Sequence, residues 1–177
     1  MKENKYSDRK KLIKVFLIRC GIAYPIWLIT YYGLIQPYSR INEWLTNLVI
    51  QGTVIGLNLL GYDTLSRGNI VTIDDQPVVL VADACNGLEL FALYSGFLLC
   101  FPGKAFYKSV FIPTGIGVIF IVNIIREIIL SLNYKFFQET FEFNHKYTYV
   151  FVVYIIVFLI WRFWLNRFSV IASGKEI

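Results

Sequence analysis

Four apolar stretches alternate with polar segments along the chain. They cover residues 12–36, 88–101, 106–132 and 147–165. A helix that crosses a bilayer needs about 20 apolar residues, and three of the stretches meet that length. The stretch 88–101 is shorter, so polar residues at its start must lie at membrane depth. The pattern predicts about four transmembrane helices in a single integral-membrane domain that takes in residues 1–177.

A further segment, residues 39–62, is apolar but carries regularly spaced polar side chains. Glu43, Asn47 and Gln51 are four residues apart, and Asn58 continues the series, with Asn42, Thr46 and Thr53 alongside. This spacing places the first three on one helical face, which is unfavourable in contact with lipid. We therefore predict an amphipathic helix that lies at the outer surface or packs over a polar site. A true span over these residues is the alternative.

Strand character appears only between residues 64 and 81. Ile70, Thr72 and the run Val78–Val81 flank the turn sequence Asp74-Asp75-Gln76-Pro77. We predict a short extracytoplasmic β-hairpin, so that residues 39–84 form an outer helix and a hairpin. The predicted fold class is an all-α polytopic membrane protein with these two additions.

Composition and charge support a membrane protein and suggest its orientation. Of the 177 residues, 56% are hydrophobic and 16% are charged, whereas soluble domains carry roughly 25% charge. The net charge of +5 does not indicate a nucleic-acid partner, because Lys and Arg lie outside the apolar runs or at their ends. Basic residues in the tail 1–11, at Lys104 and Lys108, and at Arg162 and Arg167 predict that both termini are cytoplasmic. The stretch 12–36 lacks a cleavage site of signal-peptide type, so we interpret it as an uncleaved first span.

The sequence Asp83-Ala84-Cys85-Asn86-Gly87 stands directly before the short apolar stretch. Asn and Gly suit a helix start, and the positive end of a helix favours the thiolate form of a nearby cysteine. The other cysteines, Cys20 and Cys100, show no metal-ligand spacing with Cys85. We expect three free thiols and neither a metal nor a cofactor.

Other polar residues at the outer ends of the spans are candidates for the same site. Asn123 and Arg126 share a helical face, and a charge within a span is a functional candidate unless it reaches the headgroups. His145, the only histidine, is either an interfacial residue or a proton shuttle. Glu89 is expected to be either neutral or paired with a cation, for which Arg126 is the first candidate and Arg67 and Lys146 are the alternatives. Glu127 is expected to face lipid headgroups.

Three of these features together resemble the exosortase/archaeosortase family of membrane transpeptidases, in the compact form found in Bacteroidetes-type bacteria. Ala84-Cys85-Asn86-Gly87-Leu88 resembles the family's A-C-S-G-L box, and Asn123-x-x-Arg126 resembles its N-x-x-R box. His145, ahead of the last span, matches the third element. Two positions depart from the family pattern: Asn86 replaces Ser, and Glu89 stands where many members carry Arg.

The resemblance implies a thiol protease or transpeptidase, a hydrolase-type enzyme of protein sorting in the bacterial cytoplasmic membrane. Its catalytic residues would be Cys85, Arg126 and His145 on the extracytoplasmic face, supported by Asn123, Asn86 and Glu89. Its partners would be exported proteins whose C-terminal sorting signal comprises a motif, a transmembrane helix and a basic tail. Membrane lipid and an acceptor nucleophile complete the set, and Gly96, Gly115 and Gly117 are candidate contacts for the substrate helix. The competing hypothesis is a non-enzymatic assembly or transport subunit in which Arg126 and Glu89 form a structural pair.

Overall fold

The computed structural model describes residues 2–35 and 40–169, and these are mostly helical. In chain order the helices are α1 (Lys2–Thr30), a π-turn η1 (Tyr31–Ile35), α2 (Arg40–Leu59), a 3-10 turn η2 (Asp83–Cys85), α3 (Leu88–Cys100) and α4 (Ala105–Phe136). A 3-10 turn η3 (Gln138–Thr140), a short α5 (Phe141–Phe143), a π-turn η4 (Asn144–Thr148) and α6 (Tyr149–Phe168) follow. Helix α1 begins at Lys2, so the predicted tail 1–11 is helical and continuous with the first apolar stretch; where the membrane boundary lies stays a prediction.

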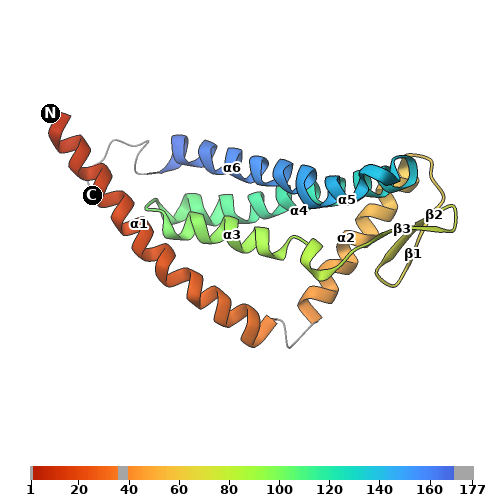
Figure 1. The fold of residues 1–177 in the computed structure, drawn as a ribbon. Helices are drawn as coiled ribbons and strands as arrows, with labels where there is room; N and C mark the ends of the chain where they lie inside the picture. Colours follow the sequence, from red (N-terminus) through yellow and green to blue (C-terminus); the bar gives the residue numbers. More distant parts are fainter. Residues whose placement is uncertain (1, 36–39, 170–177) are drawn as a thin grey trace.

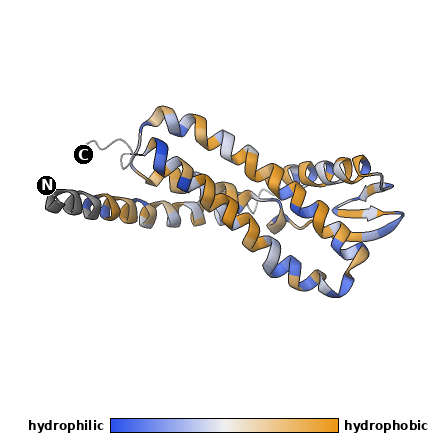
Figure 2. Cartoon of the chain, turned by 90° about the horizontal axis from the view of Figure 1, so that it is seen from above, coloured by the Kyte–Doolittle hydropathy of each residue, from blue (hydrophilic) through white to orange (hydrophobic). Residues whose placement is uncertain are grey.

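The helices α3, α4 and α6 run side by side, and α1 slants across them (Figure 1). Among the described residues, three helical segments are long and apolar enough to cross a membrane: Lys11–Leu34, Ala105–Phe136 and Gln138–Phe168. The apolar helix Leu88–Cys100 is shorter, at 13 residues. The chain is therefore a membrane protein with several apolar helices, and Figure 2 shows hydrophobic residues along most of their length. Whether α3 makes a fourth crossing stays a prediction.

A small sheet lies at the end of the helix bundle opposite the two chain ends (Figure 1). It is a three-stranded antiparallel meander of β1 (Thr64–Arg67), β2 (Ile70–Ile73) and β3 (Gln76–Leu80). The predicted hairpin is thus correct for β2 and β3, whose turn contains Asp74 and Asp75, but the prediction missed β1. Since Thr64–Arg67 has only one buried side chain, its sequence carries almost no apolar alternation.

Helix α2 joins the sheet to the bundle. Val49, Ile50 and Leu57 on α2 share one buried cluster with the apolar side chains of β2 and β3. Gly52 and Gly56 let α2 approach α4 closely, because a Cβ at either position would overlap Ile124 or Ile128. The polar stripe that includes Glu43, Asn47, Gln51 and Asn58 is exposed, whereas the flanking Asn42, Thr46 and Thr53 are buried. Helix α2 therefore packs over the bundle through a face that is itself partly polar; its place relative to the bilayer stays a prediction.

A second buried cluster fills the other end of the bundle. Its buried members are Tyr94, Leu98, Phe101, Ile119, Val157 and Trp164. The Phe97 and Trp161 rings stack at 3.9 Å between centroids, and Phe101 meets Trp164 edge-on. The bundle thus has an aromatic end near the chain termini and, at its far end, the sheet and the polar residues described next.

Candidate functional site

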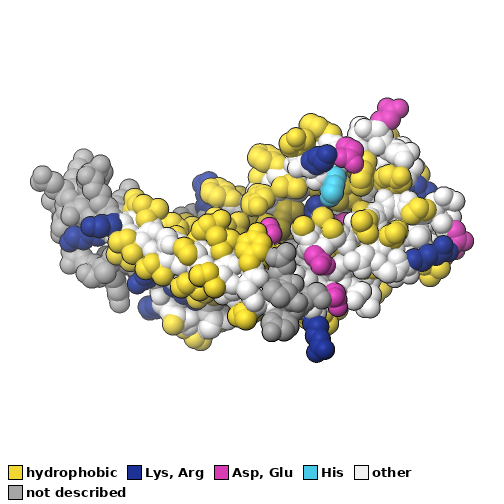
Figure 3. Space-filling model, turned by 60° about the horizontal axis from the view of Figure 1, so that its bottom comes forward, with side chains coloured by type: hydrophobic (Ala, Val, Ile, Leu, Met, Phe, Trp, Pro, Cys, Tyr) yellow, Lys and Arg dark blue, Asp and Glu magenta, His cyan; other side chains and the backbone are white. Residues whose placement is uncertain are grey.

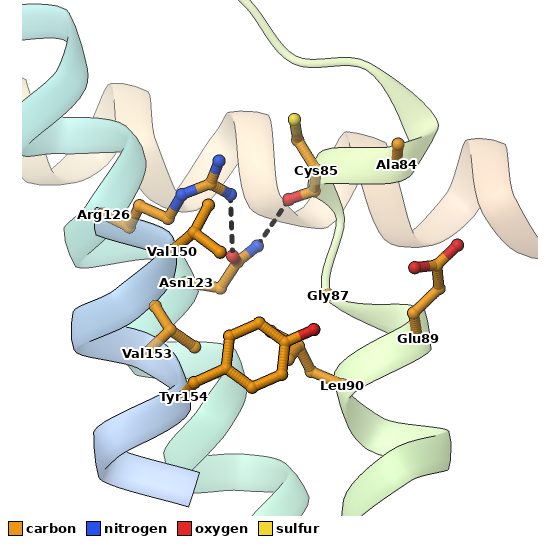
Figure 4. Close-up of a pocket in the computed structure, with 10 residues that line it drawn as sticks. All are labelled: Ala84, Cys85, Gly87, Glu89, Leu90, Asn123, Arg126, Val150, Val153 and Tyr154. Atoms are coloured by element: carbon orange, nitrogen blue, oxygen red, sulfur yellow. Dashed lines mark hydrogen bonds between the residues drawn. The ribbon is translucent and has the colours of Figure 1, made fainter. Parts of the chain in front are cut away.

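Residues from three separate segments line a cavity of about 200 Å³ at the sheet end of the bundle. The turn before α3 supplies Ala84, Cys85 and Gly87, α4 supplies Asn123 and Arg126, and α6 supplies Val150, Val153 and Tyr154, with Glu89 and Leu90 from α3 completing the lining. Figure 4 shows Arg126 and Asn123 on one side of this cavity and the Cys85 turn on the other.

Cys85 is the last residue of the 3-10 turn η2, and two residues, Asn86 and Gly87, separate it from α3. The backbone of Gly87, the N-cap of α3, has φ 89°, a conformation that glycine adopts without steric cost. Cys85 therefore lies before α3 and not in its first turn, because the left-handed Gly87 separates it from the start of the helix at Leu88. The thiol is half-buried and stands at the cavity rim.

Asn86 fixes this turn to α2. Its buried side-chain amide donates to the Oδ1 of Asn42 at 3.2 Å and to the Oγ1 of Thr46 at 3.3 Å, while its Oδ1 accepts the backbone N–H of Leu88 at 2.9 Å. Thr46 in turn donates to the Oδ1 of Asp83 at 2.8 Å. The buried polar residues of α2 therefore hold the cysteine turn, which is the role that the prediction of a helix over a polar site requires.

Asn123 and Arg126 approach the turn from α4. The Nδ2 of Asn123 donates to the carbonyl oxygen of Cys85 at 2.7 Å, and the Nη1 of Arg126 donates to the Oδ1 of Asn123 at 3.5 Å. The Arg126 side chain is 11% exposed and lines the cavity. This burial argues against the alternative in which Arg126 only reaches toward headgroups.

His145 completes the group from the segment before α6. Its Nε2 lies 3.9 Å from the Sγ of Cys85, although the two residues are 60 positions apart in the sequence. The ring stacks on Phe141, and it belongs to the π-turn η4, a wide helical turn of a kind frequent at functional sites. Asn144 accepts from Thr148 and donates to Asn133, which ties this turn to α4. The segment 133–146 is mostly helical.

Glu89 does not have the partner that the sequence suggested. Arg126 contacts Glu127, Arg67 pairs with Asp75, and Lys146 pairs with Glu142. The Glu89 side chain is exposed at the rim of the cavity, turned away from Arg126 (Figure 4). The structural pair of Arg126 and Glu89, on which the non-enzymatic hypothesis rested, is therefore absent from the described residues.

Glu127 is the site residue that sequence reasoning missed. It was expected to face headgroups, but its side chain is 1% exposed and its Oε1 lies 3.2 Å from the Nη1 of Arg126. The signal was available in the spacing, because Glu127 follows Asn123 by four residues and so shares its buried face.

A second cavity, of about 440 Å³, lies between α1, α3 and α6 and shares Glu89 and Tyr154 with the first. Gly96 lines it and has open space around it, as does Gly117 elsewhere on the surface. Gly115, by contrast, packs under the ring of Tyr94 and is closed to any partner helix. Of the three predicted contacts for a substrate helix, Gly115 is therefore excluded.

The chemistry available here is that of a thiol beside an imidazole, with a guanidinium and a carboxamide on the opposite wall. A nucleophile next to a proton acceptor, with cationic donors nearby, is the arrangement used for covalent acyl transfer. Within residues 2–35 and 40–169, no group of three His, Cys, Asp or Glu side chains gathers as metal ligands do. Figure 3 shows the cyan imidazole on the same face as a group of magenta carboxylates, beside a hollow of the surface.

Comparison with known proteins gives one match. A family profile described as transmembrane exosortase (Exosortase_EpsH) matches residues 14–162, which include every residue of the site. Searches of the curated proteins and of the solved structures returned no match.

Proposed function

The chain belongs to the transmembrane exosortase family, and on this premise we propose that it is a cysteine transpeptidase of protein sorting. It cleaves the C-terminal sorting signal of exported proteins through a thioester on Cys85 and transfers the protein to an acceptor nucleophile. The catalytic residues are Cys85, His145 and Arg126.

One observation carries this proposal: the contact of 3.9 Å between the Sγ of Cys85 and the Nε2 of His145. In the first step the thiolate of Cys85 attacks the carbonyl carbon of the scissile peptide. The C–N bond then breaks, His145 gives its proton to the leaving amine, and the substrate remains as a thioester on Cys85. In the second step His145 takes a proton from the acceptor, which attacks the thioester; the C–S bond breaks, and the Cys85 thiolate and the protonated His145 are restored.

Arg126 and Asn123 stabilise the negative charge that develops on the carbonyl oxygen in both steps. Attack on the carbonyl produces an oxyanion, and donors that already face it lower the barrier. The hydrogen bond from Asn123 to the Cys85 carbonyl keeps the two walls of the cavity at a fixed separation. Because Arg126 lines the same cavity, its free donors are available to the oxyanion.

The distribution of basic residues supports an orientation with both termini in the cytoplasm. Lys104, Lys108, Arg162 and Arg167 are found around the aromatic end of the bundle, and the site lies at the other end. In this orientation Cys85 reacts at the extracytoplasmic face. The 13 residues of α3 extend about 20 Å at 1.5 Å per residue, less than the roughly 30 Å of a hydrocarbon core. The cysteine turn then lies within the bilayer's outer boundary, where a cleavage motif next to a transmembrane helix would be presented.

The decisive experiment is to trap the thioester. When cells that express the parent protein and its substrate are quenched in acid, a substrate fragment should remain on Cys85 and be seen by mass spectrometry as an adduct that hydroxylamine removes. Arg162→Lys, far from the cavity, is the matched control and should show the adduct at the parental level. If substrate is processed in these cells but no adduct forms on Cys85 in either protein, the thioester mechanism is wrong.

A further inference from the structure

We propose that Glu127 is a positioning residue for the reaction, whose carboxylate balances the charge of Arg126 and holds its guanidinium on the cavity wall opposite Cys85. The role of Arg126 in this inference rests on the proposed function. The charge pairing itself does not, because it can be measured without a substrate.

The burial of Glu127 is the first observation. Its side chain is 1% exposed, although it lies in the outer half of an apolar helix. A carboxylate removed from both water and headgroups is costly unless a cation or hydrogen bonds compensate it. Arg126 supplies the cation, with its Nη1 at 3.2 Å from Oε1. This contact lacks hydrogen-bond geometry, so what Glu127 receives is mainly charge compensation.

The contacts of Arg126 give the second observation. Asn123 and Glu127 both contact the same nitrogen, Nη1, which restrains that end of the guanidinium. The buried Nε of Arg126 has no hydrogen-bond partner, so no further group holds the guanidinium at this nitrogen. The other terminal nitrogen therefore remains for a ligand in the cavity. The carboxylate of Glu127 and the amide of Asn123 therefore determine the charge balance and the position of the Arg126 guanidinium from the α4 side.

These contacts form a continuous series from Glu127 to the nucleophile. Glu127 contacts Arg126, Arg126 donates to Asn123, and Asn123 donates to the backbone carbonyl of Cys85. All three side chains come from one stretch of α4. Among the described residues no other carboxylate forms an ion pair with Arg126, and Glu89 stands at the rim. Removing the charge of Glu127 therefore leaves Arg126 uncompensated beside the thiol.

The test measures the electrostatic potential at Cys85 with two thiol reagents of opposite charge. Methanethiosulfonate ethylsulfonate is anionic and methanethiosulfonate ethyltrimethylammonium is cationic, and mass spectrometry of the intact protein in membranes gives the rate of each at Cys85. For Glu127→Gln we expect the ratio of anionic to cationic rates to rise about tenfold or more, because one negative charge near the thiol is lost. Arg126→Gln should lower the ratio by a similar factor.

The double variant Arg126→Gln/Glu127→Gln removes both charges and should return the ratio close to that of the parent. Glu139→Gln, at an exposed position, should leave it unchanged. Thr53→Val removes a buried hydrogen bond without removing a charge, so it controls for loss of stability. Neither control residue belongs to the site.

An unchanged ratio in Glu127→Gln would overturn the proposal, since a neutral Glu127 cannot compensate Arg126. So would a double variant that keeps the ratio of either single variant. If Glu127→Gln fails to accumulate in membranes, Glu127→Asp decides: it keeps the charge and should show the parental ratio, and any other ratio contradicts the pairing. The expected ratios combined with an absence of Cys85 adducts in cells would reject the proposed enzyme while the charge pair stands.

Discussion

Cys85 and Cys100 lie at the two ends of α3, and the surroundings of the two thiols differ in kind. Cys85 is half-buried, contacts an imidazole, and has a backbone carbonyl bonded to Asn123. Cys100 is buried in the aromatic half of the bundle, beside Cys20. Cations also occur at that end, but they bind backbone: Arg19 donates to the carbonyl of Cys100 and Lys108 to that of Leu99.

The contrast teaches that residue type says little about a cysteine until its neighbours are known. At the Cys100 end, charged side chains satisfy the last carbonyls of a helix, and the thiol serves as a small apolar group. At the Cys85 end, the left-handed Gly87 separates the 3-10 turn from α3, so that the thiol lies in a short turn among polar groups. Four experiments test or refine this contrast.

Removing each thiol should give the largest difference. Cys85→Ala should reduce processing of a sorting-signal substrate by on the order of 10³-fold or more, because the nucleophile is lost, and adding His145→Ala should cost almost nothing further. Cys100→Ala, the matched variant at the other end of α3, should process as the parent does. The measurement is the ratio of processed to unprocessed substrate in cells, normalised to enzyme level. Processing by Cys85→Ala would refute the transpeptidase proposal.

Changing the shape of the cation while keeping its charge comes next. Arg126→Lys should lower processing by about 10²-fold, because lysine lacks the planar fork that contacts Asn123 and an oxyanion together. Arg162→Lys, at the aromatic end and exposed, should have almost no effect. The same processing assay applies, with membrane insertion checked by fractionation. If Arg126→Lys processes substrate as well as the parent does, Arg126 acts only as a charge or as a lipid anchor.

Reagent access should separate the two thiols by at least about tenfold in rate. A membrane-impermeant maleimide added to intact spheroplasts should label Cys85 but not Cys100, since Cys100 is buried and at the other end of the bundle. Peptide mass spectrometry measures both sites in one sample. If Cys85 is labelled only after permeabilisation, the proposed orientation is wrong and the site faces the cytoplasm.

Stability changes of similar size at the two ends should have different consequences for the thiol. Asn86→Ala leaves buried partners on α2 unsatisfied and should lower stability by roughly 1–3 kcal/mol. Gly115→Ala forces a methyl against Tyr94 and should cost about 1–3 kcal/mol as well. Thermal unfolding in detergent measures both, and only Asn86→Ala should also change the alkylation rate of Cys85. An equal change in both variants would mean that the turn responds to global stability and not to Asn86.

Much of the site could be predicted from sequence because polar residues are rare in apolar helices. Cys85, Asn123, Arg126 and His145 each interrupt an apolar context, and the structure brings them to one end of the bundle. Their catalytic roles stay a proposal. The partner of Arg126 was not found from the sequence: Glu127 was expected to face headgroups, although its spacing of four residues from Asn123 places both on one face of α4. Its contact with Arg126 became evident only from the packing of α4.

The fold was predictable where length and hydropathy determine it, and less so where short-range conformation does. The apolar helices were found, and α3 begins at Leu88 as the apolar stretch indicates, but the left-handed angle of Gly87, which lies between Cys85 and this helix, leaves no trace in hydropathy. The strand β1 has too few apolar residues to be recognised, and it exists because it pairs with β2. The polar stripe of α2 identified a special helix, although the side chains that hold the cysteine turn are those next to the stripe.

The π-turn at Asn144–Thr148 has a consequence for how this site tolerates insertions and deletions. His145 and Val150 are five residues apart, yet both face the Cys85 side of the bundle, and the hydrogen bonds of a π-turn join residues five positions apart. Deleting one residue from this turn would restore an α-helical repeat and rotate everything before it by about 100° relative to α6. The buried face of α6 would stay in place, while the imidazole would leave the thiol. The histidine therefore depends on a one-residue register offset, and the length of this segment is as much a part of the site as its composition.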